Sequence, residues 1–118
     1  MSDQIKIKVS ELIGNQICIS ADDGQKVYNK IEQLVREGKQ VTVSFANVTM
    51  MVSLFLNVAI GQLYGSFDEQ HIRNQLKVEG LAPDDMELLK RVVDNAKKYY
   101  PNKKAYDAAW KKESEDEE

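Results

Sequence analysis

Apolar residues follow a period of two in several short segments of the chain, which is the pattern of half-buried strands. Residues 5–9 read Ile-Lys-Ile-Lys-Val, and residues 40–45 place Val41, Val43 and Phe45 on one face. Two further apolar runs, residues 17–19 and 72–78, lie between turn-forming or polar residues. These segments predict four strands.

Other segments repeat apolar residues every three or four positions, as amphipathic helices do. Helix-starting residues precede them, and glycines stand where the first two helices should end, at Gly38 and Gly65. Pro101-Asn102 is expected to break the third. The predicted helices cover residues 20–37, 53–64 and 83–100.

The resulting order is β-β-α-β-α-β-α. Strands that alternate with helices pack as an α/β fold, joined by right-handed crossovers. We therefore expect an α/β protein with a mixed sheet of four to five strands and helices packed mainly on one side.

The chain has 118 residues, enough for one domain with a modest core. We assign residues 1–100 to this domain and residues 101–112 to a short helical extension that packs through Tyr106 and Trp110. Residues 113–118, ESEDEE, form an acidic tail that we expect to be disordered.

The net charge of −3 arises from this tail. The tail holds five of the 19 acidic residues, which leaves 14 against 16 basic residues in the body. Nucleic-acid-binding domains usually have a stronger basic excess. One cluster, Lys97 to Lys104, combines lysines with Tyr99 and Tyr100 and could contact a nucleic acid by stacking and charge, so it is kept as a minor alternative.

Membrane and secretory signals are not predicted. The longest apolar stretch, Val52 to Ile60, is far shorter than the ~20 residues of a membrane span. The N-terminus has no apolar signal-peptide region, and the single cysteine, Cys18, cannot form an internal disulfide. These features together favour the cytoplasm.

No residue pattern for catalysis or for a cofactor is evident. His71 is the only histidine and Cys18 the only cysteine, too few for a zinc site. The glycines are scattered rather than gathered in a phosphate-binding loop. Asp22-Asp23 is better explained by helix capping than by a metal pair. We expect a protein that is not an enzyme, with no cofactor and no bound metal.

The stretch Ser53 to Tyr64 allows two interpretations of its serine and two of its helix. Ser53 can cap the helix, or it can be a modification site. The apolar residues spread around the helix rather than along one face, which means burial on more than one side. Other elements of the fold, a partner protein or a second copy of the chain could cover them.

Two segments carry a family resemblance: SADDGQKVYNKIEQLVREGKQVTVSF (residues 20–45) and NVTMMVSLFLNVAIGQLYG (residues 47–65). In the second segment, five residues fit the family pattern of a serine loop, a Phe-Leu pair and a helix: Ser53, Phe55, Leu56, Gly61 and Leu63. The chain resembles, over about residues 5–98, the STAS-like domains of uncharacterised function, relatives of sulfate-transporter and anti-sigma-factor-antagonist domains.

This resemblance implies a bacterial or phage-encoded protein-interaction module with a regulatory role. In the antagonist branch, a partner that is a histidine-kinase-like ATPase phosphorylates a serine at a helix start. The chain departs from that pattern: the strand ends Ser44-Phe45 rather than Asp-Phe, and residues 51–54 read Met-Val-Ser-Leu where the antagonists have Asp-Ser-Ser-Gly.

By this resemblance Ser53 is the candidate phosphorylation site. The implied partner surface consists of Asn47, Thr49, Met50, Met51, Ser53, Leu54, Phe55 and Asn57. The alternatives are a dimer or scaffold that self-associates through the apolar helix 54–64, and the minor alternative of nucleic-acid binding through Lys97 to Lys104.

Overall fold

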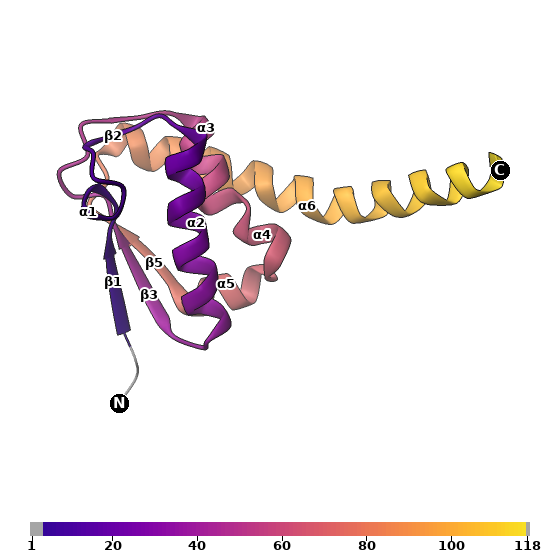
Figure 1. Cartoon of the computed structure of the whole chain (residues 1–118), viewed down its shortest axis with the longest axis horizontal. Helices are drawn as coiled ribbons and strands as arrows, with labels where there is room; N and C mark the ends of the chain where they lie inside the picture. The colour runs from indigo at the N-terminus through magenta and orange to yellow at the C-terminus, as the bar shows by residue number, and fades with distance from the viewer. Residues whose placement is uncertain (1–3, 118) are drawn as a thin grey trace.

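The structure, a computed structural model, describes the backbone of residues 4–117 and the side chains of residues 4–100. Twelve elements follow one another along these residues (Figure 1). They are β1 (Gln4–Lys8), α1 (Val9–Ile13), β2 (Ile17–Cys18), α2 (Ala21–Arg36), β3 (Gln40–Ser44), β4 (Met50–Met51), α3 (Ser53–Leu56), the π-helix η1 (Asn57–Gly61), α4 (Leu63–Ser66), α5 (Glu69–Gln75), β5 (Leu76–Glu79) and α6 (Pro83–Glu117).

Within residues 4–117, five strands form two parallel sheets, so the α/β class is confirmed but the single mixed sheet is wrong. One sheet has the order β1-β3-β5, and the other pairs β2 with β4. The short helix α1 and Gly14, whose φ is +70°, carry the chain away after β1. After this excursion β2 pairs in parallel with β4 and does not join the sheet of β1.

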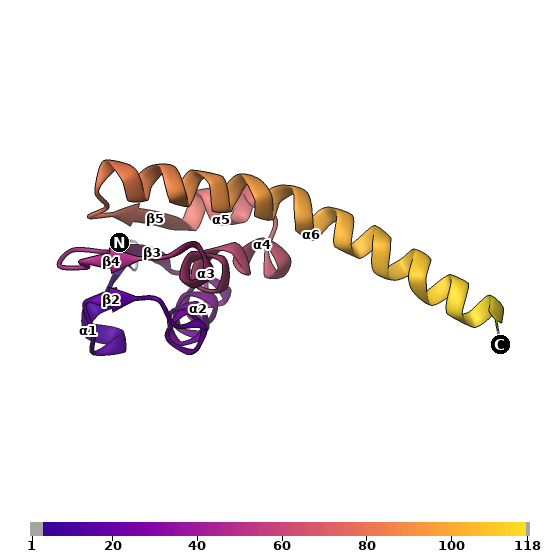
Figure 2. The same cartoon turned by 90° about the horizontal axis from the view of Figure 1, so that it is seen from above.

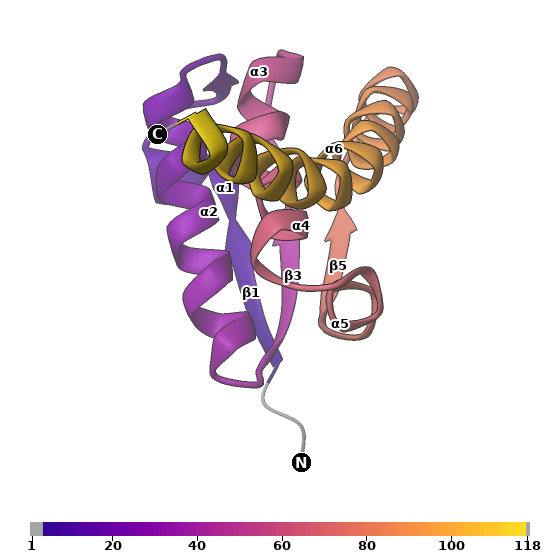
Figure 3. The ribbon, with the colours of Figure 1, turned by 90° about the vertical axis from the view of Figure 1, so that its right-hand side faces the viewer.

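The three-stranded sheet has one covered and one open face. Ile7, Val41 and Val43 are buried on the face against which α2, α3 and α4 pack (Figures 1 and 3). The opposite face carries polar side chains, among which Lys6 and Glu79 form an ion pair of 3.3 Å across β3. This alternation is what the period of two in residues 5–9 and 40–45 predicted.

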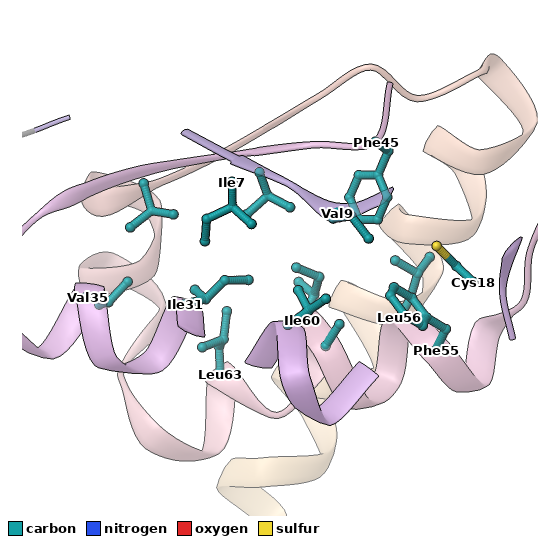
Figure 4. Packing of buried hydrophobic residues seen from close by; sticks show 14 of the residues in the cluster. Ile7, Val9, Cys18, Ile31, Val35, Phe45, Phe55, Leu56, Ile60 and Leu63 are labelled. Carbon is teal, nitrogen blue, oxygen red and sulfur yellow. The ribbon is translucent and has the colours of Figure 1, made fainter. Parts of the chain in front are cut away.

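The core lies between this sheet and the helices. Figure 4 shows Ile7 and Phe45 pointing from the strand layer toward Ile31, Ile60 and Leu63 of the helices. The segment from α3 to α4 contacts α2 on one side and α6 on the other. Packing within the fold therefore accounts for most of the apolar surface that residues 54–64 spread around their helix.

That segment is not one regular helix. The predicted helix 53–64 divides into α3, the π-helix η1 and α4. Gly65 does not end the helix but lies inside α4, where a Cβ would come within 2.7 Å of the Tyr100 ring. The glycine is thus needed for the close packing of α4 against α6.

The predicted strand 72–78 is half wrong, because its first half is the helix α5. Asp68 caps this helix: its Oδ1 accepts the His71 backbone N–H at 2.7 Å. Glu69 and Arg73, four residues apart, add an ion pair of 2.8 Å. Only residues 76–79 remain as a strand.

The observed boundaries of α2 agree with the predicted ones, and those of α6 differ. The Ser20 Oγ accepts the Asp23 N–H at 3.2 Å, and Gly38, with φ of +81°, follows the end of α2. The backbone of α6 continues through Pro101, where a break was expected. The side chains of the extension 101–112 and the tail 113–118 lie outside the described residues, so this division of the chain stays a prediction.

Candidate functional site

The candidate site is built on the two-stranded ribbon of β2 and β4. Ile17 pairs with Met50 and Cys18 with Met51. The Val52 N–H donates to the Cys18 carbonyl at 3.1 Å, which continues the pairing beyond the two strands. In parallel strands, paired residues point to the same face.

One face of this ribbon is apolar and exposed. Cys18 is fully buried beneath it, while its neighbours in the sequence point outward. The exposed side chains, which we name the ribbon patch, are Ile17 (37% exposed), Ile19 (47%), Met50 (55%), Val52 (36%) and, at the start of α3, Leu54 (51%). Exposed apolar residues that gather in one place mark interaction sites more often than residues scattered singly.

The structure brings together most of the surface residues that the family resemblance implied. Asn47, Thr49, Met50, Ser53, Leu54 and Asn57 are exposed, and Met51 is half-buried. Phe55 is fully buried in the core, so its side chain leaves the proposed surface.

Sequence reasoning missed three members of the ribbon patch: Ile17, Ile19 and Val52. The alternation of Ile-Cys-Ile predicts a strand, but it does not predict which side of that strand is buried. The pairing with β4 joins residues 33 positions apart and leaves no signal in either segment.

Ser53 does not cap the helix, contrary to the capping interpretation. The N-cap residue of α3 is Val52, and no side chain caps this helix. Ser53 is the first residue of α3, and it is exposed between Val52 and Leu54 of the ribbon patch. The fold therefore leaves Ser53 on the surface.

A polar hollow of about 470 Å³ adjoins the ribbon patch. Apart from Gly14 and the shared Ile17, its lining consists of uncharged polar residues: Ser10, Asn15, Gln16, Asn47 and Thr49. Two contacts stabilise its rim: Asn15 Oδ1 accepts the Ile17 N–H at 3.0 Å, and the Thr49 hydroxyl donates to the Gln16 carbonyl at 3.4 Å. The site thus combines apolar side chains with neighbouring hydrogen-bonding groups.

Cys18, Asp23 and His71 each have contacts or burial that the packing of the fold explains. Burial, with a smaller effect of the carboxylates of Asp23 and Asp85, raises the pKa of the Cys18 thiol to about 11. Asp23 pairs with Lys26 at 3.7 Å, and the His71 ring stacks on Phe67 at 5.0 Å between centroids. Among the described residues, no three His, Cys, Asp or Glu side chains gather as a metal ion would require.

The basic cluster is only partly visible. Lys97 forms an ion pair of 3.5 Å with Glu69 of α5. The side chains of Lys103 and Lys104 lie outside the described residues, so the cluster as a nucleic-acid site stays a prediction. Within the part of the chain that the structure describes, no helix has the length and apolar character that crossing a membrane requires.

Comparison with known families supports the resemblance drawn from residues 20–65. Residues 23–86 match the model of the STAS-like domain of unknown function (DUF4325), and this range includes β4 and the serine segment. Neither the curated proteins nor the solved structures contain a match to the chain. Because the matched range spans more than half of the sequence, the chain belongs to the family of STAS-like domains of unknown function.

Proposed function

We propose that this protein is a non-enzymatic interaction module that binds another protein through the ribbon patch. The observation that carries the proposal is the set of large apolar side chains exposed on one face of β2 and β4 and at the start of α3. Membership of the STAS-like family supports this proposal, because the related STAS domains serve as protein-binding modules.

The composition of the surface suits a protein partner. Protein interfaces combine an apolar centre with a polar rim that forms hydrogen bonds. Here Met50 and Leu54 are the most exposed members of the apolar centre, while Asn47 and Thr49 lie beside them on the rim. Methionine adapts its shape to a partner surface more readily than branched side chains do.

Phosphorylation of Ser53 would regulate this contact. A phosphoryl group adds about two negative charges at neutral pH. At Ser53 these charges would stand between Val52 and Leu54, and a partner would have to desolvate them in order to cover the patch. We therefore expect phosphorylation to release the partner, and the family resemblance points to a histidine-kinase-like ATPase as the partner and the kinase.

Affinity capture from the native cell tests the contact surface. The bait is the full chain, compared with Met50→Glu and with the matched control Tyr99→Glu, whose side chain is also 55% exposed but lies on α6. We expect a protein that wild type and Tyr99→Glu capture and Met50→Glu loses. Equal capture by all three baits would show that the ribbon patch is not the contact.

Mass spectrometry of the same cells tests the regulation. We expect phosphate on Ser53 and loss of the partner from Ser53→Glu but not from Ser53→Ala. Retention of the partner by Ser53→Glu, with no phosphate found on Ser53, would refute the switch and leave the contact surface standing.

Self-association is the main competing function, and the same patch could serve it. Sedimentation over a range of concentrations separates the two. A monomer at all concentrations favours the partner protein, whereas a dimer that Met50→Glu dissociates would assign the patch to a second copy of the chain.

A further inference from the structure

A second hollow lies away from the ribbon patch, between β5, α5 and α6. Figure 2 shows α5 and β5 running alongside the first turns of α6. The walls of this hollow are apolar and come from η1, α5, β5 and α6: Ile60, Ile72, Leu76, Val78, Leu89 and Val93. The volume is about 160 Å³.

Charged and polar groups complete the lining of this hollow. They are Tyr64, Glu69, Arg73 and Lys97. The Glu69 Oε2 lies 2.8 Å from Arg73 Nη2 and 3.5 Å from Lys97 Nζ. All three side chains stay in contact with solvent, with exposed fractions between 32% and 64%.

Tyr64 contributes a hydroxyl that can donate a hydrogen bond. Burial raises the pKa of Tyr64, with further contributions from Glu69 and Asp94 that Arg73 partly opposes. The phenol is therefore protonated at neutral pH. The charged groups that line the hollow are of both signs: the carboxylate of Glu69 and the cations of Arg73 and Lys97.

Ligand pockets are typically apolar, with a few convergent polar groups that orient the ligand. This hollow has that composition, and its size limits the ligand. An apolar protein cavity of about 150 Å³ holds a benzene molecule. A hollow of about 160 Å³ therefore has room for one branched aliphatic side chain.

The geometry points to a binding site for a free apolar α-amino acid of about the size of leucine. Its side chain would fill the space between β5 and α6. Arg73, with its planar fork of donors, would bind the carboxylate, and Glu69 would bind the ammonium group. Because groups of both signs line the hollow, each charge of such a zwitterion has a partner of opposite sign there.

The ion pair between Arg73 and Glu69 does not prevent a ligand from binding between these two side chains. Pairs between exposed side chains contribute little to stability, since water screens them. A ligand that inserts between Arg73 and Glu69 replaces one exposed pair with two that are partly covered. This proposal concerns a different face of the molecule and does not depend on the ribbon patch.

Nuclear magnetic resonance titration of the full chain with L-leucine tests the proposal. We expect saturable shifts of the methyl signals of Leu76, Val78, Leu89 and Val93. L-Leucinamide, which has no carboxylate, and 4-methylpentanoate, which has no ammonium group, should each bind more weakly. L-Tryptophan, which exceeds the space, should not produce these shifts.

Variants at the charged groups complete the test. Arg73→Gln and Glu69→Gln should each weaken leucine binding at least about tenfold, since each removes a charge-assisted contact. Lys77→Gln, on the open face of the sheet, is the control and should bind as wild type does. The proposal is overturned if leucine produces no saturable shift in wild type, if the two analogues that each lack one charged group bind as well as leucine, or if the folded Arg73→Gln and Glu69→Gln proteins bind unchanged.

Discussion

Gly24 of α2 packs directly against Val58 of η1, so closely that a Cβ at Gly24 would have to displace its neighbours. A Cβ at Gly24 would lie 3.0 Å from the Val58 Cβ and 3.0 Å from the carbonyl oxygen of Phe55. The π-helix therefore touches the backbone of α2, and this contact fixes the segment that follows Ser53 against the rest of the core.

Gly24→Ala should lower the free energy of unfolding. Alanine favours a helix over glycine by about 1 kcal/mol, but overpacking of a tight contact costs about 1–3 kcal/mol. We expect a net loss of about 1 kcal/mol, measured by urea denaturation. Gly61→Ala is the control, because its Cβ would meet its neighbours at ordinary distances of 3.6 Å or more. Equal effects of the two substitutions would contradict the close packing at Gly24.

The two serines at helix starts should differ in their effect on stability. Ser20 caps α2 through its hydroxyl, so Ser20→Ala should cost about 1 kcal/mol. Ser53 makes no such bond, so Ser53→Ala should stay within about 0.5 kcal/mol of wild type. The same denaturation measurement checks both, and a loss at Ser53 as large as that at Ser20 would restore the capping interpretation.

Gly80 and Gly14 both have positive φ angles, of +80° and +70°, but their surroundings differ. A Cβ at Gly80 would lie 2.8 Å from the backbone nitrogen of Ala46, whereas a Cβ at Gly14 would meet nothing within 4 Å. Gly14→Ala should cost about 1 kcal/mol for its backbone conformation alone. Gly80→Ala should lower the free energy of unfolding clearly more than Gly14→Ala does. Similar losses of stability in thermal unfolding of the two variants would contradict the close contact between Gly80 and the backbone of Ala46.

The Cys18 thiol should be unreactive in the folded protein at neutral pH, because it is fully buried and its pKa is raised to about 11. A chromogenic disulfide reagent should label it only on unfolding. In the folded state the Cys18 thiol keeps its proton to higher pH than an ordinary thiol, whose pKa is 9.0. Ionisation of this thiol therefore leaves the free energy of unfolding unchanged below pH 9 and lowers it above pH 9.

Between pH 9 and 10 the fall in stability from Cys18 can be measured apart from any fall due to Tyr64 and Tyr100. Burial raises the pKa values of both tyrosines above 10.0, so they lower the stability only at higher pH. The slope should not exceed about 1.4 kcal/mol per pH unit. Cys18→Ala should remove most of it, and an unchanged slope in that variant would assign the fall to another group.

Much of the fold could be predicted from local patterns. The alternation in residues 5–9 and 40–45 identified β1 and β3, and the serine before Asp22-Asp23 identified the start of α2. The prediction failed where a local cap overrode the apolar pattern, as Asp68 does for α5. It also failed where tertiary packing decided the shape of a helix, as it does at η1.

The candidate site was predictable only in part. The serine segment after β3 indicated Met50 and Leu54, which are exposed as expected. Ile17 and Ile19 join them through strand pairing between distant segments, and such pairing is a property of the folded chain. Phe55 shows the reverse case: an apolar residue beside the exposed Leu54 is buried in the core, since consecutive residues of an α-helix point in directions about 100° apart.

The central claim is that another protein covers the ribbon patch, and site-specific photo-crosslinking in the native cell tests it most directly. A photoreactive phenylalanine derivative would replace Met50 in one variant and Tyr99 in the other, two positions with equal exposure. We predict a covalent adduct with a different protein from position 50 and not from position 99. An adduct only from position 99, an adduct of the chain with itself, or no adduct from position 50 would contradict the account.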